Sequence, residues 1–289
     1  YRSDGMLSIK DGSFINKACC SIKNGFKSKG IAGESRAGFV FIIPALIVIS
    51  IFIFIPLIWV FYLSFTDTTF FNYPGEFIGL KNFIDLITWD TSWWVAFKNT
   101  LIMAGVNLPV GIVLALLSAL ILNEKLAGRT FFRWGFLVPV SSSAVAVALM
   151  WLLLYEPSNG GILNYIFRTL GFTDKPVAWL GNYNTALPAV IFTMFGRFGF
   201  RMLIYLSALQ GIPEELYEAA DIDGASKWRQ FTYITWPQLM PATFFILINN
   251  LASSLRMGFQ EVFVLTGGGP MEATRVISLA IYESAFVYG

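Results

Sequence analysis

The chain has 289 residues, of which 56% are hydrophobic and only 13% are charged, and its formal net charge is +2. Soluble domains carry about 25% charged residues, so the shortage of charge indicates a protein of the lipid bilayer. The small net charge argues against a nucleic-acid partner, and the lack of histidine excludes a histidine-based catalytic site.

The first 36 residues form a basic segment ahead of the first apolar stretch. Seven of them are Lys or Arg, and we expect the segment to lie in the cytoplasm because positive charge favours that side of a membrane. Cys19 and Cys20 are the only cysteines of the chain. Two adjacent thiols provide neither a disulfide framework nor a four-ligand zinc site, so we expect both to be reduced.

Five apolar stretches are long enough to cross a bilayer, which takes about 20 helical residues. They cover residues 37–65, 99–122, 134–155, 184–209 and 240–265. The first three carry no charge, whereas the fourth contains Arg197 and Arg201 and the fifth contains Arg256 and Glu261. The expected fold class is an all-α polytopic membrane protein, in which residues 37–289 form one transmembrane domain.

The segments between these stretches differ in positive charge. The loop of residues 123–133 holds three basic residues, whereas the loops of residues 66–97 and 156–183 hold at least as many acidic as basic residues. The positive-inside rule therefore places residues 123–133 in the cytoplasm. Alternation of the spans then places the polar segment of residues 210–240 on the same side.

The segment of residues 210–240 is predicted to form two short helices around a glycine. Pro213 suits the start of the first helix, and Gly224 accepts the left-handed conformation that ends it. Ser226 is a cap for the second helix, which Pro237 is expected to end. The residues alone leave two interpretations open, an interfacial hairpin at the lipid headgroups or a docking element with Glu218 as its charged contact.

The order of residues in this segment is similar to a known motif. Glu218-Ala219-Ala220, then Gly224-Ala225, Phe231, Ile234, Pro237 and Pro241, resemble the EAA loop of the membrane subunits of bacterial ABC importers. The flanking residues 209–217 and 265–270 resemble the maltose-type subgroup, which imports oligosaccharides and glycerol phosphate derivatives. The resemblance implies a coupling site for an ATPase at Glu218, Ala219, Ala220, Asp223, Gly224, Ala225, Phe231 and Pro237.

The resemblance covers residues 37–289 and implies the type I permease fold of ABC importers. That fold has about six core helices, so five spans would lie in this chain. The apolar tail from Val276 is too short to cross the bilayer, and it would approach a sixth helix beyond residue 289.

The resemblance also implies the partners. In this family a permease pairs with a second, similar permease and rests on two ATP-binding subunits, and an extracytoplasmic binding protein delivers the sugar. The chain contains no Gly-x-x-x-x-Gly-Lys-Ser/Thr motif, so ATP and Mg²⁺ should be bound by another subunit. We therefore expect a multi-pass cell-membrane subunit that is not an enzyme, has no catalytic or metal site and binds no cofactor of its own.

Polar residues inside the fourth and fifth spans predict a cavity. An arginine within a span costs at least about 2.5 to 3.5 kcal/mol on insertion scales, so it should face protein or water. Arg197 and Arg201 are four residues apart and share one helix face. A second stripe in the fifth span, spaced by three or four residues, consists of Asn249, Ser253, Arg256 and Gln260. Both stripes are expected to line the substrate pathway.

The arginines favour an acidic cargo, such as a uronate-containing oligosaccharide, because arginine can hold a carboxylate through two parallel hydrogen bonds. A neutral oligosaccharide or a glycerol phosphate derivative remains an alternative. Arg197 or Arg256 could instead pair with Glu261 or with the partner permease, or extend its charged end to the membrane surface. A secondary transporter is a weaker alternative, since Glu261 is the only acid in the five spans.

Overall fold

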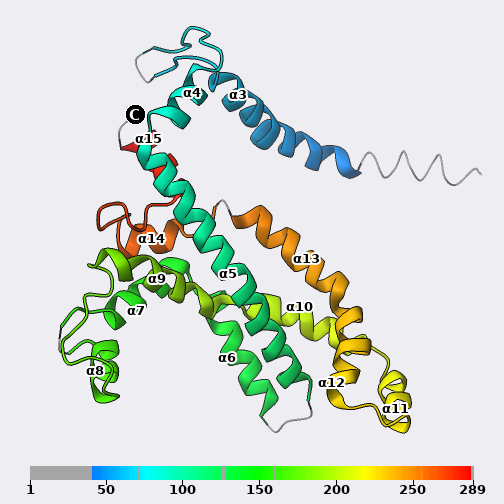
Figure 1. The fold of residues 1–289 in the computed structure, drawn as a ribbon. Helices are drawn as coiled ribbons and strands as arrows, with labels where there is room; N and C mark the ends of the chain where they lie inside the picture. Colours follow the sequence, from blue (N-terminus) through cyan, green and yellow to red (C-terminus); the bar gives the residue numbers. More distant parts are fainter. Residues whose placement is uncertain (1–40, 70–71, 125–127, 159, 255, 288–289) are drawn as a thin grey trace, which may run out of the picture. The chain divides into compact units, whose positions relative to one another are not determined.

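The computed structural model describes residues 41–69, 72–124, 128–158, 160–254 and 256–287 (Figure 1). The basic segment of residues 1–36, with Cys19 and Cys20, lies outside these ranges. The chain divides into two compact units, Tyr1–Asn82 and Phe83–Gly289, which are described separately. The short helix α4 (Lys81–Thr88) contains the boundary between them.

The first unit contains one long apolar helix, Phe41–Leu63, within the first predicted span. Its second half is α3 (Ile55–Leu63), which follows a π-helical turn at Ser50–Phe54. Pro56 lies in the first turn of α3, where its missing N–H is tolerated. The side chains of Ser50–Leu63 are not buried, so this apolar surface requires a cover of lipid or of another protein.

Helix α5 (Thr91–Asn123) is the longest element of the second unit and contains the second predicted span. It begins at Asp90, whose carboxylate accepts the N–H of Trp93 at 2.9 Å. Its buried positions recur every three or four residues, so they form a single face: Ala96, Asn99, Thr100, Met103, Asn107, Gly111, Ala115, Ala119 and Leu122. Small residues on this face allow α10 (Gly199–Gln210) to pack closely against it.

The third predicted span is two helices rather than one. Helix α6 (Arg129–Ser141) and helix α7 (Ala144–Leu154) meet at an angle of 101°. The hydroxyl groups of Ser141 and Ser142 both donate to the carbonyl oxygen of Val138, each at 2.9 Å, and Pro139 removes a backbone donor beside it. Side chains that bond to the backbone in this way compete with continuation of the helix, so the residues between Ser141 and Ala144 form a corner.

The fourth predicted span is also bent, by 41°. Helix α9 (Tyr183–Met194) passes through a 3₁₀ turn at Phe195–Arg197 and continues as α10. By length and composition, three of the described helices could each cross a membrane, or five if each bent pair counts as one span. The regular secondary structure of the described residues is helical, which confirms the predicted all-α membrane fold.

The helix that contains the fifth predicted span starts earlier and ends earlier than expected. It runs from α12 (Lys227–Gln230) through a π-helical turn at Phe231–Thr235 into α13 (Trp236–Ser254). Pro237 therefore does not end the second short helix, and that prediction was wrong. The turn before it uses bonds five residues apart, such as Trp236 N–H to Phe231 O, and this local π geometry accommodates the proline.

A break divides the fifth predicted span near its C-terminal end. Helix α14 (Phe259–Leu265) begins after Gly258, which has a φ of +83°. A left-handed residue at this position cannot continue a right-handed helix from Ser254. The predicted stripe of Asn249, Ser253, Arg256 and Gln260 thus does not lie on one continuous helix.

The core of the second unit consists of two apolar clusters. The first core cluster joins α5, α10 and α13 through Ala115, Ala119, Leu122, Met202, Tyr205, Leu206, Leu209, Ile212, Leu239 and Ile246. The second core cluster joins α5, α7, α9, α14 and α15 (Ile277–Phe286) through Met103, Ala148, Val190, Ile191, Met194, Val262, Leu265, Val276 and Leu279.

A polar layer separates the two clusters. On α5, Asn107 lies between Met103 of the second cluster and Ala115 of the first. On the bent pair of α9 and α10, Arg197 and Arg201 lie between the two clusters in the same way. The fold thus places charged groups from different elements at one level of an otherwise apolar unit.

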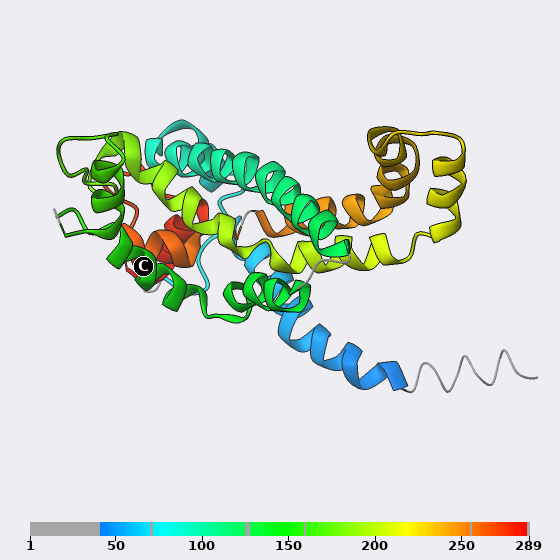
Figure 2. The same ribbon diagram turned by 90° about the horizontal axis from the view of Figure 1, so that it is seen from below.

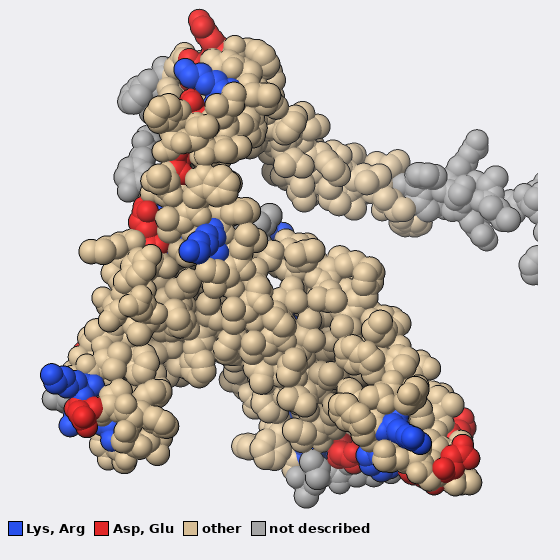
Figure 3. All heavy atoms as spheres, viewed as in Figure 1, with Lys and Arg blue, Asp and Glu red and all other residues tan. Residues whose placement is uncertain are grey.

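The ends of the second unit are distinct. Helix α11 (Glu214–Ile222) and α12 lie at one end, and α8 (Ile162–Thr169) lies at the opposite end in both ribbon views (Figures 1 and 2). The space-filling view shows most of the charged side chains on this face of the unit gathered at these two ends, with a mainly uncharged surface between them (Figure 3). This distribution is typical of a protein that spans a membrane.

Candidate functional site

The first candidate site is the segment of residues 213–237, here called the coupling segment. Its first helix, α11, has Pro213 as its N-cap residue and Glu214 and Glu215 in its first turn, where acids favour the positive end of the helix dipole. Gly224 has a φ of +69°, the left-handed conformation predicted for it. The oxygen of Ser226 then accepts the N–H of Arg229 at 3.4 Å and caps α12, also as predicted.

Hydrogen bonds across the glycine turn hold the two helices together. Gln230 is only 4% exposed, and its amide donates to the carboxylate of Asp221 and, at 3.3 Å, to the carbonyl oxygen of Ala225. The ammonium group of Lys227 lies 3.2 Å from the same carboxylate. The hydroxyl groups of Tyr217 and Thr235 form a further bond of 2.8 Å. These bonds join α11 and α12 into one body.

Asp221 is the centre of this network, and its ionisation is coupled to it. The hydrogen bond from Gln230, and then the hydrogen bond and charge of Lys227, lower the pKa of Asp221 below its ordinary value of 3.8. Both partners favour the charged carboxylate, so Asp221 is ionised throughout the physiological range.

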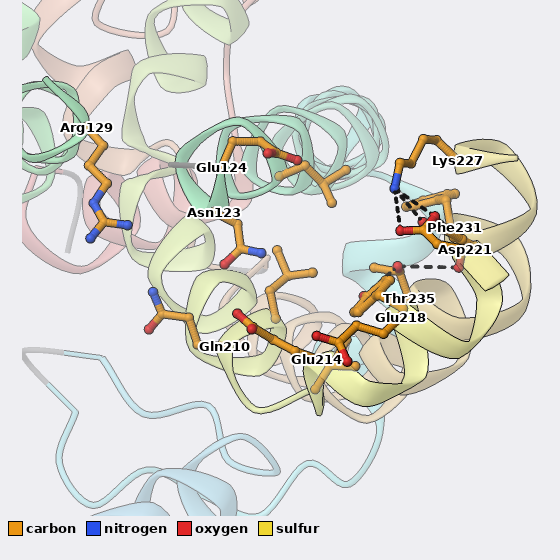
Figure 4. A pocket seen from close by; sticks show the side chains of 15 residues that line it. Asn123, Glu124, Arg129, Gln210, Glu214, Glu218, Asp221, Lys227, Phe231 and Thr235 are labelled. Atoms are coloured by element: carbon orange, nitrogen blue, oxygen red, sulfur yellow. Dashed lines mark hydrogen bonds and ion pairs between the residues drawn. The ribbon is translucent and has the colours of Figure 1, made fainter. Parts of the chain in front are cut away.

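One face of α11 borders a hollow of about 850 Å³ that opens beside the ends of α5 and α10 (Figure 4). The side chains of Glu214 and Glu218 point into it, facing Asn123, Glu124 and Gln210 across the hollow. Arg129 and the pair of Lys227 and Asp221 complete its charged lining. Because Lys227 and Asp221 neutralise each other, three glutamates face one arginine, and the hollow is suited to a cationic side chain.

A second exposed part of the coupling segment, here called its apolar face, carries the large side chains of Ile222, Trp228 and Tyr233, which are 87%, 73% and 80% exposed. Ala219 and Asp223 are exposed as well. A second hollow, of about 340 Å³, is lined by Ala220, Ala225, Arg229, Gln230, Tyr233 and Ile234. Exposed aromatic side chains beside small residues are typical of a protein-binding surface.

The second candidate site is a cavity of about 490 Å³ in the polar layer. It brings together five of the six residues predicted for the substrate pathway, namely Arg197, Arg201, Ser253, Arg256 and Gln260. Asn249 does not line it. The turn between Ser254 and Phe259 carries Arg256 to the cavity, so residues from both sides of the helix break contribute to the lining.

Arg197 and Glu261 form an ion pair inside this cavity. The guanidinium of Arg197 lies 3.0 Å from the carboxylate of Glu261, which is only 8% exposed. The pairing that the sequence left open as an alternative is thus present for Arg197, which still lines the cavity. A buried carboxylate without a partner would be costly, so the pair also stabilises Glu261 in this position.

Arg201 is held by two residues of α5. Its guanidinium donates to the side-chain oxygen of Asn107 at 3.3 Å. It also lies against Gly111, where a Cβ atom would overlap one of its terminal nitrogens. Within the described part of the chain, neither Arg201 nor Arg256 has a carboxylate partner. Three arginines and one glutamate therefore line the cavity, and its net charge is positive.

Comparison with known proteins then identifies the family. The family model described as "binding-protein-dependent transport system inner membrane component" matches residues 107–288, a range that contains the whole coupling segment and the cavity. The chain belongs to this family. The trehalose/maltose transport system permease protein MalF of Thermococcus litoralis is 36% identical over 261 residues, which are 90% of this chain and 87% of the relative.

Two solved structures are similar over most of their length. One is a bacterial ABC transporter involved in the import of the acidic polysaccharide alginate, with a TM-score of 0.72 and 27% identity over 88% of this chain and 85% of that one. The other is the bacterial alginate ABC transporter in complex with an alginate pentasaccharide-bound periplasmic protein. Its TM-score is also 0.72 and its sequence identity also 27%, over 87% of this chain and 83% of that one. The chain is therefore a multi-pass permease of the carbohydrate ABC importer class, with the fold that the EAA-like motif implied.

Several residues of the permease site escaped prediction. Asn107 and Gly111 lie in an uncharged span, and their spacing of four residues indicates only that they share a face of that helix, not that this face meets Arg201. Gln230 and Lys227 were not assigned a role, because their common partner Asp221 lies beyond the glycine turn. The burial of Gln230 on an otherwise exposed helix follows from the geometry of the turn at Gly224, which brings Asp221 to it.

Proposed function

We propose that this permease imports acidic oligosaccharides, in a process driven by ATP and dependent on a solute-binding protein. The observation that carries the proposal is the cavity in the polar layer, where three arginines face one glutamate. Charges at this depth are costly unless they serve a partner or a ligand. A carboxylate-bearing cargo would supply the missing negative charge.

The chemistry of the cavity suits a uronate. An arginine binds a carboxylate through two parallel charge-assisted hydrogen bonds, and Arg201 and Arg256 have no acidic partner within the described residues. Ser253 and Gln260 line the same cavity and can bond to sugar hydroxyl groups. The similarity to a transporter of the acidic polysaccharide alginate supports the same cargo class.

A neutral oligosaccharide is the second candidate cargo. The pairing of Arg197 with Glu261 removes one positive charge from the cavity, and the relative from Thermococcus litoralis bears the name of a trehalose/maltose permease. In that case Arg201 and Arg256 would pair with groups of a partner permease. The two candidates differ in whether the cavity arginines contact cargo carboxylates.

The coupling segment is proposed to receive the ATP-dependent movement. Its apolar face would enter a cleft of an ATP-binding subunit, and Glu218 with its hollow would accept a cationic side chain of that subunit. From the segment, α10 leads directly to Arg201 and α13 leads directly to Ser253. A displacement of the segment as one body would therefore reach the cavity along two helices and change its access.

The proposed assembly contains this chain, a second permease, two ATP-binding subunits that hold ATP and Mg²⁺, and an extracytoplasmic binding protein. The N-terminal segment and the coupling segment would both be cytoplasmic. The exposed apolar helix Phe41–Leu63 would be covered by lipid and the second permease. Supporting observations for the binding protein are the family description and the complex of the alginate transporter with its periplasmic protein.

Uptake into proteoliposomes tests this proposal. The chain is co-purified with its partner subunits, and ATP-driven uptake of a uronate trisaccharide is compared with that of a neutral trisaccharide of equal length. We expect preference for the uronate, and a fall in that preference of about tenfold or more in Arg201→Gln and Arg256→Gln, because charge-assisted hydrogen bonds contribute about 1.5 to 3 kcal/mol. Lys98→Gln, which removes a charge from α5 outside the cavity lining, should leave the preference unchanged.

Two results would contradict the proposal at different levels. A clear preference for the neutral trisaccharide would reject the acidic cargo but leave the importer class intact. Uptake that ignores ATP and follows an ion gradient would reject the ATP-driven import itself and favour a secondary transporter.

A further inference from the structure

A second, apolar pocket lies in the second unit, at the end opposite to the coupling segment. It has a volume of about 290 Å³ and is formed by the end of α7, by α8, by Trp179 in the connection and by α9. Its lining consists of Tyr155, Leu163, Phe167, Trp179, Asn184, Thr185, Pro188, Ala189 and Phe192. None of these residues lines the arginine cavity, so the pocket is a separate feature.

Three polar side chains of this pocket, those of Tyr155, Thr185 and Trp179, already have hydrogen-bond partners, which leaves Asn184 as the remaining polar side chain of the lining. The Tyr155 hydroxyl donates to the carbonyl oxygen of Ala189 at 2.9 Å, and the Thr185 hydroxyl donates to that of Trp179 at 2.7 Å. The indole N–H of Trp179 donates to Asn164 at 3.0 Å. A sugar needs several hydrogen bonds from its site, and this pocket has few left to offer, so its chemistry suits an apolar ligand.

The hairpin that carries the pocket is rigid. Asn164 is fully buried, and its amide donates to the carbonyl oxygens of Glu156 and Val177, each at 3.1 Å. Its oxygen accepts the N–H of Val177 at 3.0 Å in addition to the indole of Trp179. These bonds fix α8 and the connection to α9 around one side chain, so the pocket is largely preformed.

The position of the pocket matches one leaflet of a bilayer. Pro188, Ala189 and Phe192 lie five to nine residues into α9, or about 8 to 14 Å from its start at a rise of 1.5 Å per residue. Trp179 and Tyr183 precede these positions and suit the level of the headgroups, where aromatic rings with a polar edge gather. In a bilayer placed in this way, the pocket would extend from the headgroup level at Trp179 to hydrocarbon depth at Phe192, in the leaflet that faces away from the coupling segment.

The surface around the pocket is apolar as well. Phe192 in the lining is exposed and packs against Trp151 of α7, a helix on which Leu149, Met150 and Leu153 are also exposed. On α8, one exposed face carries Ile162, Tyr165 and Ile166. A helix with an exposed apolar face next to a membrane span is typical of a segment that lies in the interface. The pocket is therefore continuous with a surface that lipid chains would cover.

We propose that this pocket holds an acyl chain of a phospholipid and so anchors the α8 hairpin in its leaflet. The lipid acts as a structural ligand, distinct from the cargo in the arginine cavity.

The test uses the full chain with its co-purifying subunits in vesicles of phosphatidylethanolamine and phosphatidylglycerol at about 3:1. A trace of phosphatidylglycerol carries a photoreactive diazirine on one acyl chain, and cross-links are mapped by mass spectrometry. We expect labelling of the peptide that contains Pro188 to Phe192 about fivefold above that of Phe244 and Phe245, which are exposed on α13 without a pocket.

Three variants of α8 sharpen the test. Leu163→Trp fills the pocket and should reduce the labelling at Pro188 to Phe192 about fivefold, to the level of an open surface. Leu163→Phe should give an intermediate reduction and serves as the milder variant if the tryptophan disturbs folding. Leu170→Trp, at an exposed position that does not line the pocket, should leave the labelling unchanged.

Other outcomes would overturn the proposal. Equal labelling of the pocket and of α13, or labelling that ignores Leu163→Trp and Leu163→Phe, would show that no acyl chain occupies the pocket. Loss of the label when a uronate or neutral oligosaccharide is added would instead make the pocket a sugar site. Labelling only in the isolated chain, and not in the complete importer, would show that another subunit covers the pocket.

Discussion

The coupling segment and the arginine cavity differ in how they treat their charges. In the coupling segment, Asp221 has both Gln230 and Lys227 as partners, and these bonds join the two short helices. In the cavity, Glu261 neutralises Arg197, while Arg201 donates to the uncharged amide of Asn107 and has no carboxylate partner among the described residues. Charges are inexpensive in water and costly inside a membrane, so unbalanced charge costs more in the cavity than in the coupling segment.

This difference shows which charges require a partner. The coupling segment uses Asp221 and Lys227 as an internal brace, while Glu214 and Glu218 are exposed at its hollow. The cavity keeps positive charge unbalanced, which requires a ligand or another subunit to complete it.

The largest effect is expected from breaking the coupling segment. Glu218→Lys combined with Gly224→Asp reverses the charge in the hollow and places a side chain at a φ of +69°. ATP-driven uptake should fall by more than about tenfold, because the coupled movement is lost, while the chain still inserts into the membrane. The measurement is uptake together with the yield of the chain in the membrane fraction.

A matched variant separates this effect from a general change of charge. Glu215→Lys makes the same charge reversal on α11 at a residue that does not line the hollow, and it should retain most of the uptake. Unchanged uptake in the double variant would contradict the coupling role. Equal losses in both variants would assign the effect to net charge instead.

The next largest effect should come from the cavity side of the comparison. Gly111→Ala places a methyl group where the guanidinium of Arg201 lies, so Arg201 must leave Asn107. We expect the preference for a uronate over a neutral trisaccharide to fall by about tenfold, since one charge-assisted contact is lost. Gly105→Ala on the same helix has open space around its added atom and should behave as the unaltered chain.

If Gly111→Ala and Gly105→Ala give the same preference, Arg201 does not select the cargo. The uptake rate for the neutral trisaccharide provides the internal reference, because a general packing defect would lower the uptake of both sugars.

The two regions also differ in how far the sequence predicts them. In the coupling segment, the sequence predicts the start of the first helix at Pro213, the turn at Gly224 and the cap at Ser226. It does so because caps and glycine turns are local features that depend on a few neighbours. Pro237 was wrong for the same local reason, since a proline rule cannot anticipate a π-helical turn directly before it.

The cavity depends on contacts between helices whose arrangement in space the sequence does not reveal. The residue types of Arg197 and Arg201 predicted a polar lining, but the choice of Glu261 as the partner of Arg197 depends on the break at Gly258. The bent third span escaped prediction because the run from Trp134 to Tyr155 is uncharged, and three serines in an otherwise apolar run do not by themselves indicate a break. Its corner depends on side-chain hydrogen bonds of two serines.

A smaller effect is expected from releasing Arg197. Glu261→Gln leaves three arginines in the cavity without an acid, which should strengthen binding of a uronate relative to a neutral sugar by about threefold to tenfold. The measurement is the concentration dependence of ATPase stimulation with the two trisaccharides. Glu156→Gln, an exposed acid outside the cavity lining, is the control, and a weaker uronate preference in Glu261→Gln would show that Glu261 does not compete with the cargo.

The smallest effect concerns acid and the coupling segment alone. The pKa of Asp221 is lowered in the folded chain by Gln230 and Lys227, so the stability it contributes is present above its ordinary pKa of 3.8 and is lost as the pH falls through the lowered value. Hydrogen exchange of the peptide covering α11 and α12, corrected for intrinsic rates, should show a few-fold loss of protection below about pH 3.8, because exposed pairs contribute little.

Asp221→Asn should abolish this pH dependence, whereas Asp223→Asn, outside the network, should retain it. If both variants lose protection alike in acid, the network around Gln230 is not what makes the segment rigid, and its rigidity must come from the bond between Tyr217 and Thr235.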